Sequence, residues 1–277
     1  MKFDSRKKIS VAEFTNVEDC DITNTKNIVE DGEIYTVKTY MRGYRVYAIK
    51  YLNGEKQIHR KNGPALIFYN KNNIIREIWY RNGLISRVGA PAIKLYEDGN
   101  IYLKVFAING VVGDQGDFPA RIYYFDGKIS SIAHAKNSII HRENGPAIIR
   151  FSDNRIISKE FYENGHYRTF DKGPGKIEFR DDGKLKLIEY YNSKSQFHRD
   201  KGPARVSLKI GAITKTEILR IEYRNNMEYN RLDGPALIRI NTSTGEKLGE
   251  RFFIDDKEYD EFQYEIVKAG KAFEEKV

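Results

Sequence analysis

The chain has 277 residues, with 47 Lys and Arg against 39 Asp and Glu and a formal net charge of +8. This excess is diluted among many acids, which favours a solvated surface over a dedicated nucleic-acid groove. Cys20 is the only cysteine, which excludes an internal disulfide and a multi-cysteine metal site and favours a reducing, intracellular location. No run of signal-peptide or membrane-spanning length is present, so we expect a soluble protein that is neither secreted nor membrane-spanning.

The N-terminal stretch, residues 1–32, carries no repeat landmark. Ile9, Val11 and Phe14 alternate loosely with polar residues. We predict an N-terminal cap here, because the end units of a repeat array must cover an exposed core. A degenerate first unit follows from residue 33, with two alternating segments typical of strands.

A proline-containing motif organises the rest of the chain. Its clearest copies have the form His-Arg-x-x-Gly-Pro-Ala and span His59–Ala65, His141–Ala147 and His198–Ala204. Weaker copies contain the other prolines, Pro91, Pro119, Pro174 and Pro235. Successive prolines of the seven are 27, 28, 27, 28, 29 and 32 residues apart. A period in this range indicates a repeat array.

Each unit has the pattern of two strands. A short run follows the proline, then an Asx-containing turn such as Asp98-Gly99 or Asp126-Gly127, then a longer run that ends on an aromatic residue. Asx-Gly pairs are typical of tight hairpin turns, and proline is tolerated at the first residue of a strand. We therefore predict an all-β fold over residues 33–257. We expect this fold to be an elongated, curved antiparallel meander of hairpins with about 27–29 residues per repeat.

The two faces of these strands differ in character. Positions one, three and five after each proline are apolar, with Lys94 as the exception, and we assign them to the core. Positions two and four form the opposite face, which is apolar in the first two units and basic later. We predict a partner-binding surface at Leu66, Phe68, Ile93 and Leu95, or alternatively coverage of these four by the N-terminal segment. The later basic residues are candidates for polyanion binding: Arg121, Arg150, Lys176, Arg205 and Arg239.

Histidine and arginine recur at equivalent positions of the repeat. Such residues lie in a row along an array, whereas a catalytic or metal centre needs groups that converge on one point. We interpret them as repeat connectors that bond backbone carbonyls or stack on a neighbouring aromatic: His59, Arg60, His141, Arg142, His198 and Arg199. Residues 113–117, Gly-Asp-Gln-Gly-Asp, faintly resemble an acidic metal loop but lack a second ligand cluster. We predict no catalytic residues, no metal, no cofactor and no small-molecule substrate.

The last segment, residues 258–277, has helical periodicity. Phe262, Ile266, Ala269 and Phe273 recur at steps of four, three and four, and Asp255-Asp256 can cap the start. We predict a short amphipathic helix that caps the last hairpin.

Together the Tyr-x-Asn-Gly, His-Arg-x-x-Gly-Pro-Ala and Asx-Gly elements resemble the variant MORN-type repeats, over roughly residues 33–257. Such proteins are abundant in giant amoeba-infecting DNA viruses and occur in some phages and bacteria. The resemblance implies a β-hairpin array used for tethering, junctions or assembly. We therefore expect a non-enzymatic scaffold with a protein partner, in the host cytoplasm or the virion if the chain is viral. The alternative is a sequence-nonspecific binder of nucleic acid or anionic membrane. The partner's identity and the oligomeric state stay open.

Overall fold

The computed structural model describes residues 21–210 and 217–274. The chain divides into two compact units, residues 1–154 (unit 1) and residues 155–277 (unit 2). The apolar residues Ile9, Val11 and Phe14 of the expected cap lie outside the described residues. Residues 21–30 of that cap form a strand that pairs with the next one.

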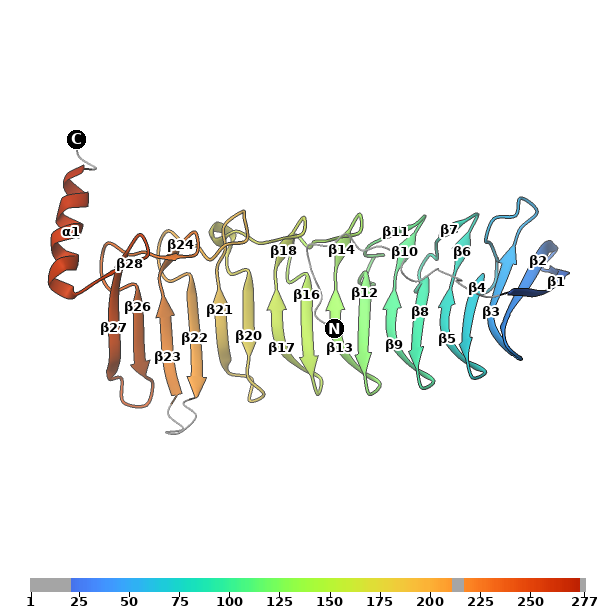
Figure 1. Ribbon diagram of the computed structural model, residues 1–277, viewed down its shortest axis with the longest axis horizontal. Coiled ribbons are helices and arrows are strands. Elements are labelled where there is room, and N and C mark those ends of the chain that lie inside the picture. The colour runs from blue at the N-terminus through green and yellow to red at the C-terminus, as the bar shows by residue number, and fades with distance from the viewer. Residues whose placement is uncertain (1–20, 211–216, 275–277) are drawn as a thin grey trace. The chain divides into compact units, whose positions relative to one another are not determined.

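Unit 1 is an antiparallel meander in which each long strand pairs with the next long strand along the chain. Its long strands are β1 (Asp21–Glu30), β2 (Glu33–Arg42), β3 (Arg45–Leu52), β4 (Leu66–Asn70), β5 (Asn73–Ile78), β8 (Ile93–Glu97), β9 (Asn100–Val105), β12 (Arg121–Phe125), β13 (Lys128–Ala133) and β16 (Ile148–Ser152). Short hairpins lie at one end of the long strands (Figure 1): β6 (Tyr80–Arg81) with β7 (Leu84–Ile85), β10 (Ala107–Ile108) with β11 (Val111–Val112), and β14 (Ala135–Lys136) with β15 (Ile139–Ile140).

Unit 2 repeats this plan and adds a helix. Its long strands are β17 (Arg155–Glu160), β20 (Lys176–Phe179), β21 (Leu185–Glu189), β22 (Arg205–Ile210), β23 (Glu217–Glu222), β26 (Leu237–Asn241) and β27 (Lys247–Ile254). The remaining elements are β18 (Tyr162–Glu163), β19 (His166–Tyr167), a 3-10 turn (Phe170–Lys172), β24 (Arg224–Asn225), β25 (Glu228–Tyr229), β28 (Lys257–Tyr259) and α1 (Glu261–Glu274). The predicted all-β fold of antiparallel hairpins with one short C-terminal helix is confirmed.

The proline sets where each unit's first strand begins. In all seven proline-containing repeats, the first strand starts two residues after the proline. The residue between them is small because it is enclosed: the Ala at this position is fully buried in six units. Gly175 takes its place in the remaining unit, where a Cβ would lie 2.5 Å from the Tyr191 ring. A larger side chain at this position therefore has no room.

The hairpin turns have the backbone that the sequence predicts. Asp98 and Gly99 have φ values of 47° and 82°, and Asp126 and Gly127 have 48° and 73°. Two consecutive positive φ values are typical of the type I′ turn, whose twist matches that of the flanking strands. Asx and Gly residues tolerate this conformation at the least energetic cost.

The assignment of the two faces is wrong beyond the first position of each unit. Positions three and five, which we expected in the core, are only half-buried in most units, as at Ile177 and Phe179. Positions two and four of the first two units are the better buried ones. The reason is lateral packing: Ile78, itself fully buried, lies between Leu66 and Ile93 on the neighbouring strands.

The C-terminal helix packs through a different face from the expected one. Phe262 is 77% exposed and Ile266 and Ala269 are also exposed, while the side chain of Phe273 lies outside the described residues. Tyr264 is fully buried instead and packs on Phe252 of β27, with ring centroids 4.9 Å apart.

Polar bonds explain both the orientation and the start of α1. The Tyr264 hydroxyl donates to the Arg231 carbonyl (2.8 Å) and accepts from the Gly234 N–H (3.0 Å). Asp260 accepts a 2.8 Å bond from the Gln263 N–H and caps the helix. The predicted cap, Asp255-Asp256, forms the β27–β28 turn.

Candidate functional site

A recurring arginine holds five of the seven connectors together. Lying four residues before the proline, its guanidinium donates a bond of 3.1–3.4 Å to the proline carbonyl at Arg60, Arg87, Arg142, Arg199 and Arg231. In four of these connectors the guanidinium also lies 3.8–4.2 Å from the centre of an aromatic ring at the end of the preceding long strand or one residue beyond it. These pairs are Arg60 over Tyr51, Arg87 over Trp79, Arg199 over Tyr190 and Arg231 over Tyr223. A cation over an aromatic face and a charge-assisted bond both stabilise this fold of the chain.

The glycine before the proline is part of the same arrangement. At Gly202, φ is 105° and a Cβ would lie 3.4 Å from the Arg199 guanidinium carbon. At Gly234, φ is 153° and the corresponding distance to Arg231 is 3.2 Å. The Arg-x-x-Gly-Pro spacing therefore places a flat cation against a residue without a side chain.

We expect Arg199→Met to destabilise unit 2 by about 1–3 kcal/mol, because it keeps the aliphatic stem but removes the ring contact and the bond to Pro203. The measurement is urea-induced unfolding. Lys201→Met, at an exposed position of the same connector, is the matched control and should change stability little. Equal unfolding midpoints for the two variants would contradict the role of the guanidinium.

The three repeat-equivalent histidines have separate sets of partners. His59 Nδ1 accepts from the Asn82 N–H (3.0 Å), and His198 Nδ1 accepts from the Asn226 N–H (3.4 Å). Their Nε2 atoms lie near different carboxylates: Glu33 (3.4 Å) for His59, Glu143 (3.5 Å) for His141 and Asp200 (2.9 Å) for His198. Within the described ranges, no group of three or more His, Cys, Asp or Glu residues is placed to hold a metal ion.

The third connector, residues 113–117, departs from this pattern. Asp114 and Gln115 occupy the places of the histidine and arginine. The Asp114 carboxylate accepts from the N–H groups of Ala120 (2.8 Å) and Ala135 (3.1 Å) and lies 2.7 Å from His134 Nδ1. Phe118 stacks on Phe106, with centroids 5.3 Å apart, where other connectors have the guanidinium. This aspartate is thus a structural cap with its oxygens already engaged.

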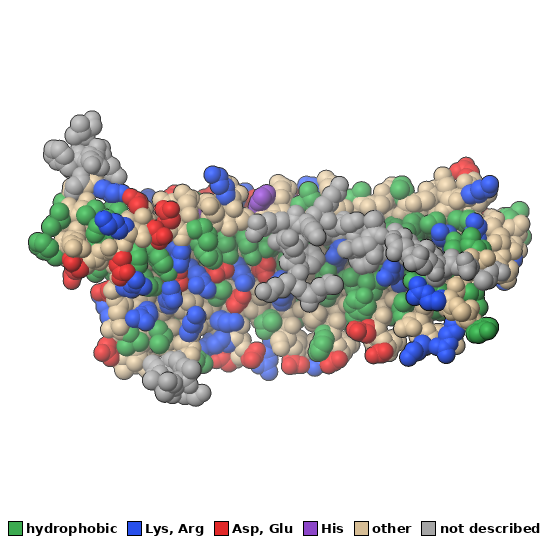
Figure 2. All heavy atoms as spheres, in the orientation of Figure 1, with side chains coloured by type: hydrophobic (Ala, Val, Ile, Leu, Met, Phe, Trp, Pro, Cys, Tyr) green, Lys and Arg blue, Asp and Glu red, His purple; other side chains and the backbone are tan. Residues whose placement is uncertain are grey.

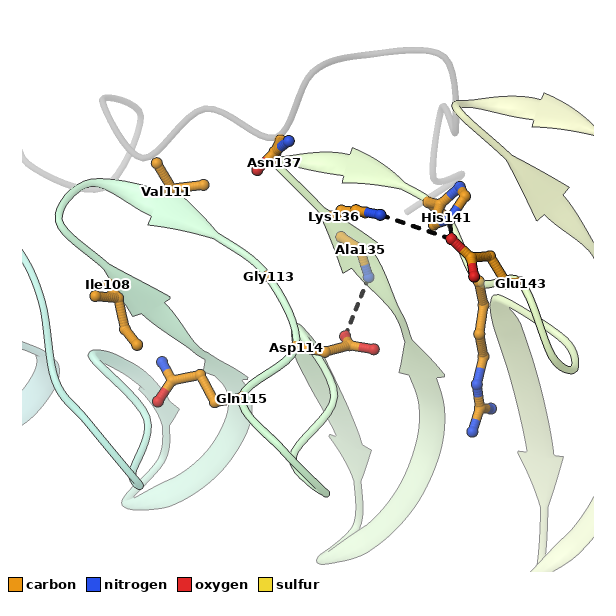
Figure 3. A pocket seen from close by; sticks show the side chains of 11 residues that line it. Ile108, Val111, Gly113, Asp114, Gln115, Ala135, Lys136, Asn137, His141 and Glu143 are labelled. Carbon is orange, nitrogen blue, oxygen red and sulfur yellow. Dashed lines mark hydrogen bonds and ion pairs between the residues drawn. The ribbon is translucent and has the colours of Figure 1, made fainter.

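A cavity of about 440 Å³ lies beside this irregular connector (Figure 3). Ile108 and Val111 form part of an apolar wall, and Lys136 and Glu143 point toward one another with an Nζ–Oε1 distance of 3.6 Å. The charged groups of the cavity bond to one another or to the backbone. We therefore assign no chemistry to it.

The predicted partner-binding residues are not exposed. Leu66, Phe68, Ile93 and Leu95 have exposed fractions of 0, 2, 0 and 4%. One covering group is the Arg76 guanidinium, which lies 4.9 Å from the Phe68 ring centre. The segment proposed as an alternative cover, with Ile9, Val11 and Phe14, lies outside the described residues. The expectation that these four form an exposed surface is wrong.

The predicted polyanion-binding residues are mostly engaged within the protein. Arg121 is buried and donates to the Tyr123 hydroxyl (3.1 Å), and Lys176 lies 2.6 Å from Glu178. Arg150 is half-buried, and Arg205 bonds to two glutamates. Arg239 differs: it is exposed and lies directly opposite Arg220 on the neighbouring strand.

A buried carboxylate organises the charged face of unit 2. Glu222 is 0% exposed and lies 3.1 Å from Arg205, 2.9 Å from Arg220 and 2.8 Å from Arg224. Arg205 also contacts Glu189 (3.0 Å), so adjacent strands are linked by alternating charges. Figure 2 shows Lys and Arg side chains interspersed with Asp and Glu side chains over unit 2.

The network shifts the pKa of the central carboxylate. Burial alone would raise the pKa of Glu222, but the bond from Arg224 and the charges of Arg220, Arg224 and Arg205 outweigh it and hold the pKa below 4.5. Sequence reasoning missed this network. Its signal was a glutamate at the last position of the long strand, before the aromatic residue, at Glu160, Glu189 and Glu222.

The opposite face of unit 2 carries an uninterrupted aliphatic row. Its members lie directly opposite one another on five successive strands and are half-buried: Ile177, Ile188, Val206, Ile221 and Ile238. We call them the aliphatic row. A second set of half-buried apolar residues lies beside it: Phe179, Leu185, Leu208, Leu219 and Ile240.

The equivalent row of unit 1 is broken by charge. Glu77, Lys94 and Lys104 occupy successive strands between Ile67 and Ile122. Lys94 and Glu77 form an ion pair with a 3.6 Å separation. At this position of the repeat, unit 1 keeps a run of only three aliphatic residues, Ile122, Ile132 and Ile149, on successive strands, whereas the run in unit 2 has five.

The chain matches no protein-family model, no curated protein and no solved structure. Among the described helices, none is long and apolar enough to cross a membrane.

Proposed function

We propose that this protein is a non-enzymatic interaction scaffold that binds a protein partner through the aliphatic row of unit 2. The observation that carries the proposal is the in-register alignment of five aliphatic side chains that stay only half-buried. Contiguous apolar surface of this kind marks interaction sites on soluble proteins. The resemblance to variant MORN-type repeats supports a role in tethering or assembly, including a viral assembly.

The connectors support the same function. Their arginines, histidines and glycines are engaged in bonds that hold successive hairpins together, which is the task of a scaffold. The charged groups beside the cavity of unit 1 are likewise bonded internally. These contacts favour binding over catalysis.

Substitution of the aliphatic row tests the proposal. In Ile188→Lys/Ile221→Lys, long polar side chains replace half-buried ones, so we expect the chain to stay folded by circular dichroism and to lose its bound proteins. The assay compares the proteins that co-purify with tagged wild-type and variant chains from the native host, untagged copies of this chain included. Leu232→Lys, at an exposed connector position, is the matched control and should recover the wild-type set. Identical recovery by the row variant would contradict the proposal.

A second candidate function, binding of a polyanion, rests on Arg239. Two arginines directly opposite each other repel, and Glu222 already serves three guanidiniums, so a phosphate-bearing ligand would relieve the repulsion. Arg239→Gln should then weaken retention on heparin or nucleic acid and reduce its salt dependence, whereas Lys194→Gln, an exposed loop position, should change it less. Equal elution of the two variants would exclude Arg239 as the contact.

A further inference from the structure

The aliphatic row of unit 2 ends in opposite charges. Lys159 on β17 lies opposite Ile177, and Glu250 on β27 lies opposite Ile238. The complete row across seven strands therefore reads Lys159, Ile177, Ile188, Val206, Ile221, Ile238, Glu250. With neighbouring strands about 4.8 Å apart, the two charged residues are separated by roughly 29 Å.

When this row is read in reverse and placed against itself, Lys159 faces Glu250 at both ends and aliphatic residues face one another between them. Two copies that face each other can be related by a two-fold axis along the strands or by one across them. An axis along the strands reverses the row, so that each Lys159 meets a Glu250 and the aliphatic residues meet one another, with Val206 at the centre. An axis across the strands would place lysine against lysine and glutamate against glutamate, which is unfavourable.

We propose that unit 2 pairs face to face with a second copy of this chain, about a two-fold axis parallel to its strands. This inference rests on the proposed function, because it names the partner of the same surface. The interface is isologous: each charge pair occurs twice, and the aliphatic rows of both copies are removed from water.

The aliphatic row and the second set form an apolar surface of the kind that two packed sheets bury between them. The aliphatic row and the second set beside it cover five strands, or roughly 24 Å across the sheet, and two same-face positions along each strand, or roughly 13 Å. Facing sheets pack about 10 Å apart with interdigitated side chains. In the single chain, Glu250 pairs with Lys247 (2.8 Å), which is itself largely exposed and can release the carboxylate to Lys159 of the second copy.

Charge reversal tests both the dimer and its axis. The full-length chain is studied by sedimentation equilibrium over a range of concentrations. We expect Lys159→Glu and Glu250→Lys each to weaken self-association about tenfold, because two attractive pairs become repulsive. The double variant restores opposite charges at both sites and should return to near the wild-type dissociation constant. Lys257→Glu, which makes the same charge change in β28, should leave the constant unchanged.

The outcomes separate this inference from the function on which it rests. A wild-type chain that stays monomeric at all concentrations, or a dimer unaffected by Ile188→Lys/Ile221→Lys, overturns the proposed pairing. If host proteins are nevertheless lost by that row variant, the scaffold function stands without the dimer. A dimer that both single reversals weaken equally but the double variant does not restore overturns the axis, since only the reversed row places Lys159 against Glu250.

Discussion

Replacement of Leu66 by aspartate is expected to destabilise unit 1 by several kcal/mol, at least as much as the roughly 2–5 kcal/mol of a buried Leu→Ala change. Leu66 is fully buried and lies directly opposite Ile78, which is fully buried as well. A carboxylate at this position loses the apolar contacts and has to be protonated or to open the sheet. Adding Phe68→Asp should enlarge the effect, since Phe68 lies on the same face two residues further on.

The measurement is the urea midpoint of each purified variant. Leu84→Asp is the control, because Leu84 belongs to the same unit but is half exposed. Its stability should stay within about 1 kcal/mol of wild type. A Leu66→Asp chain with wild-type stability would show that this face opens to solvent, and it would return Leu66 and Phe68 to the candidate partner-binding surface.

Replacement of Glu222 by glutamine is expected to destabilise unit 2 by about 3–5 kcal/mol, because removing one partner of a buried ion network leaves the others uncompensated. Arg205, Arg220 and Arg224 would then share a region without their central carboxylate. Glu228→Gln, at an exposed position of β25, is the matched control and should have little effect. Urea unfolding at neutral pH provides the comparison.

The same residue predicts a pH dependence. The folded-state pKa of Glu222 is held below 4.5, the ordinary value that applies in the unfolded chain. Its stabilising contribution is therefore fully present above pH 4.5 and is lost as the pH falls through the lowered folded-state pKa. The loss of stability on acidification should be smaller in Glu222→Gln than in wild type. Parallel pH profiles would contradict the assigned pKa shift.

The local pattern of the chain determined its elements. Proline spacing gave the units, and Asx-containing turns gave the hairpins, because φ preferences act over a few residues and need no distant partner. The row of connector residues could be predicted for the same reason: Arg60 bonds to Pro64 and Arg199 to Pro203, each only four residues away.

The tertiary structure alone decided which face is covered and which charges meet. Alternation along a strand distinguishes two faces but carries no information on which of them is better packed, so Leu66 was assigned to the wrong side. Of the partners of Glu222, Arg220 lies on the same strand and Arg224 only two residues further along the chain, whereas Arg205 lies on β22. Only the register of β22 and β23 brings Arg205 opposite Glu222. The buried face of α1 was decided in the same way: the hydroxyl of the buried Tyr264 donates to the carbonyl of Arg231, 33 residues earlier in the chain. Contacts of this kind depend on how hairpins pair, and that information lies in the assembled sheet.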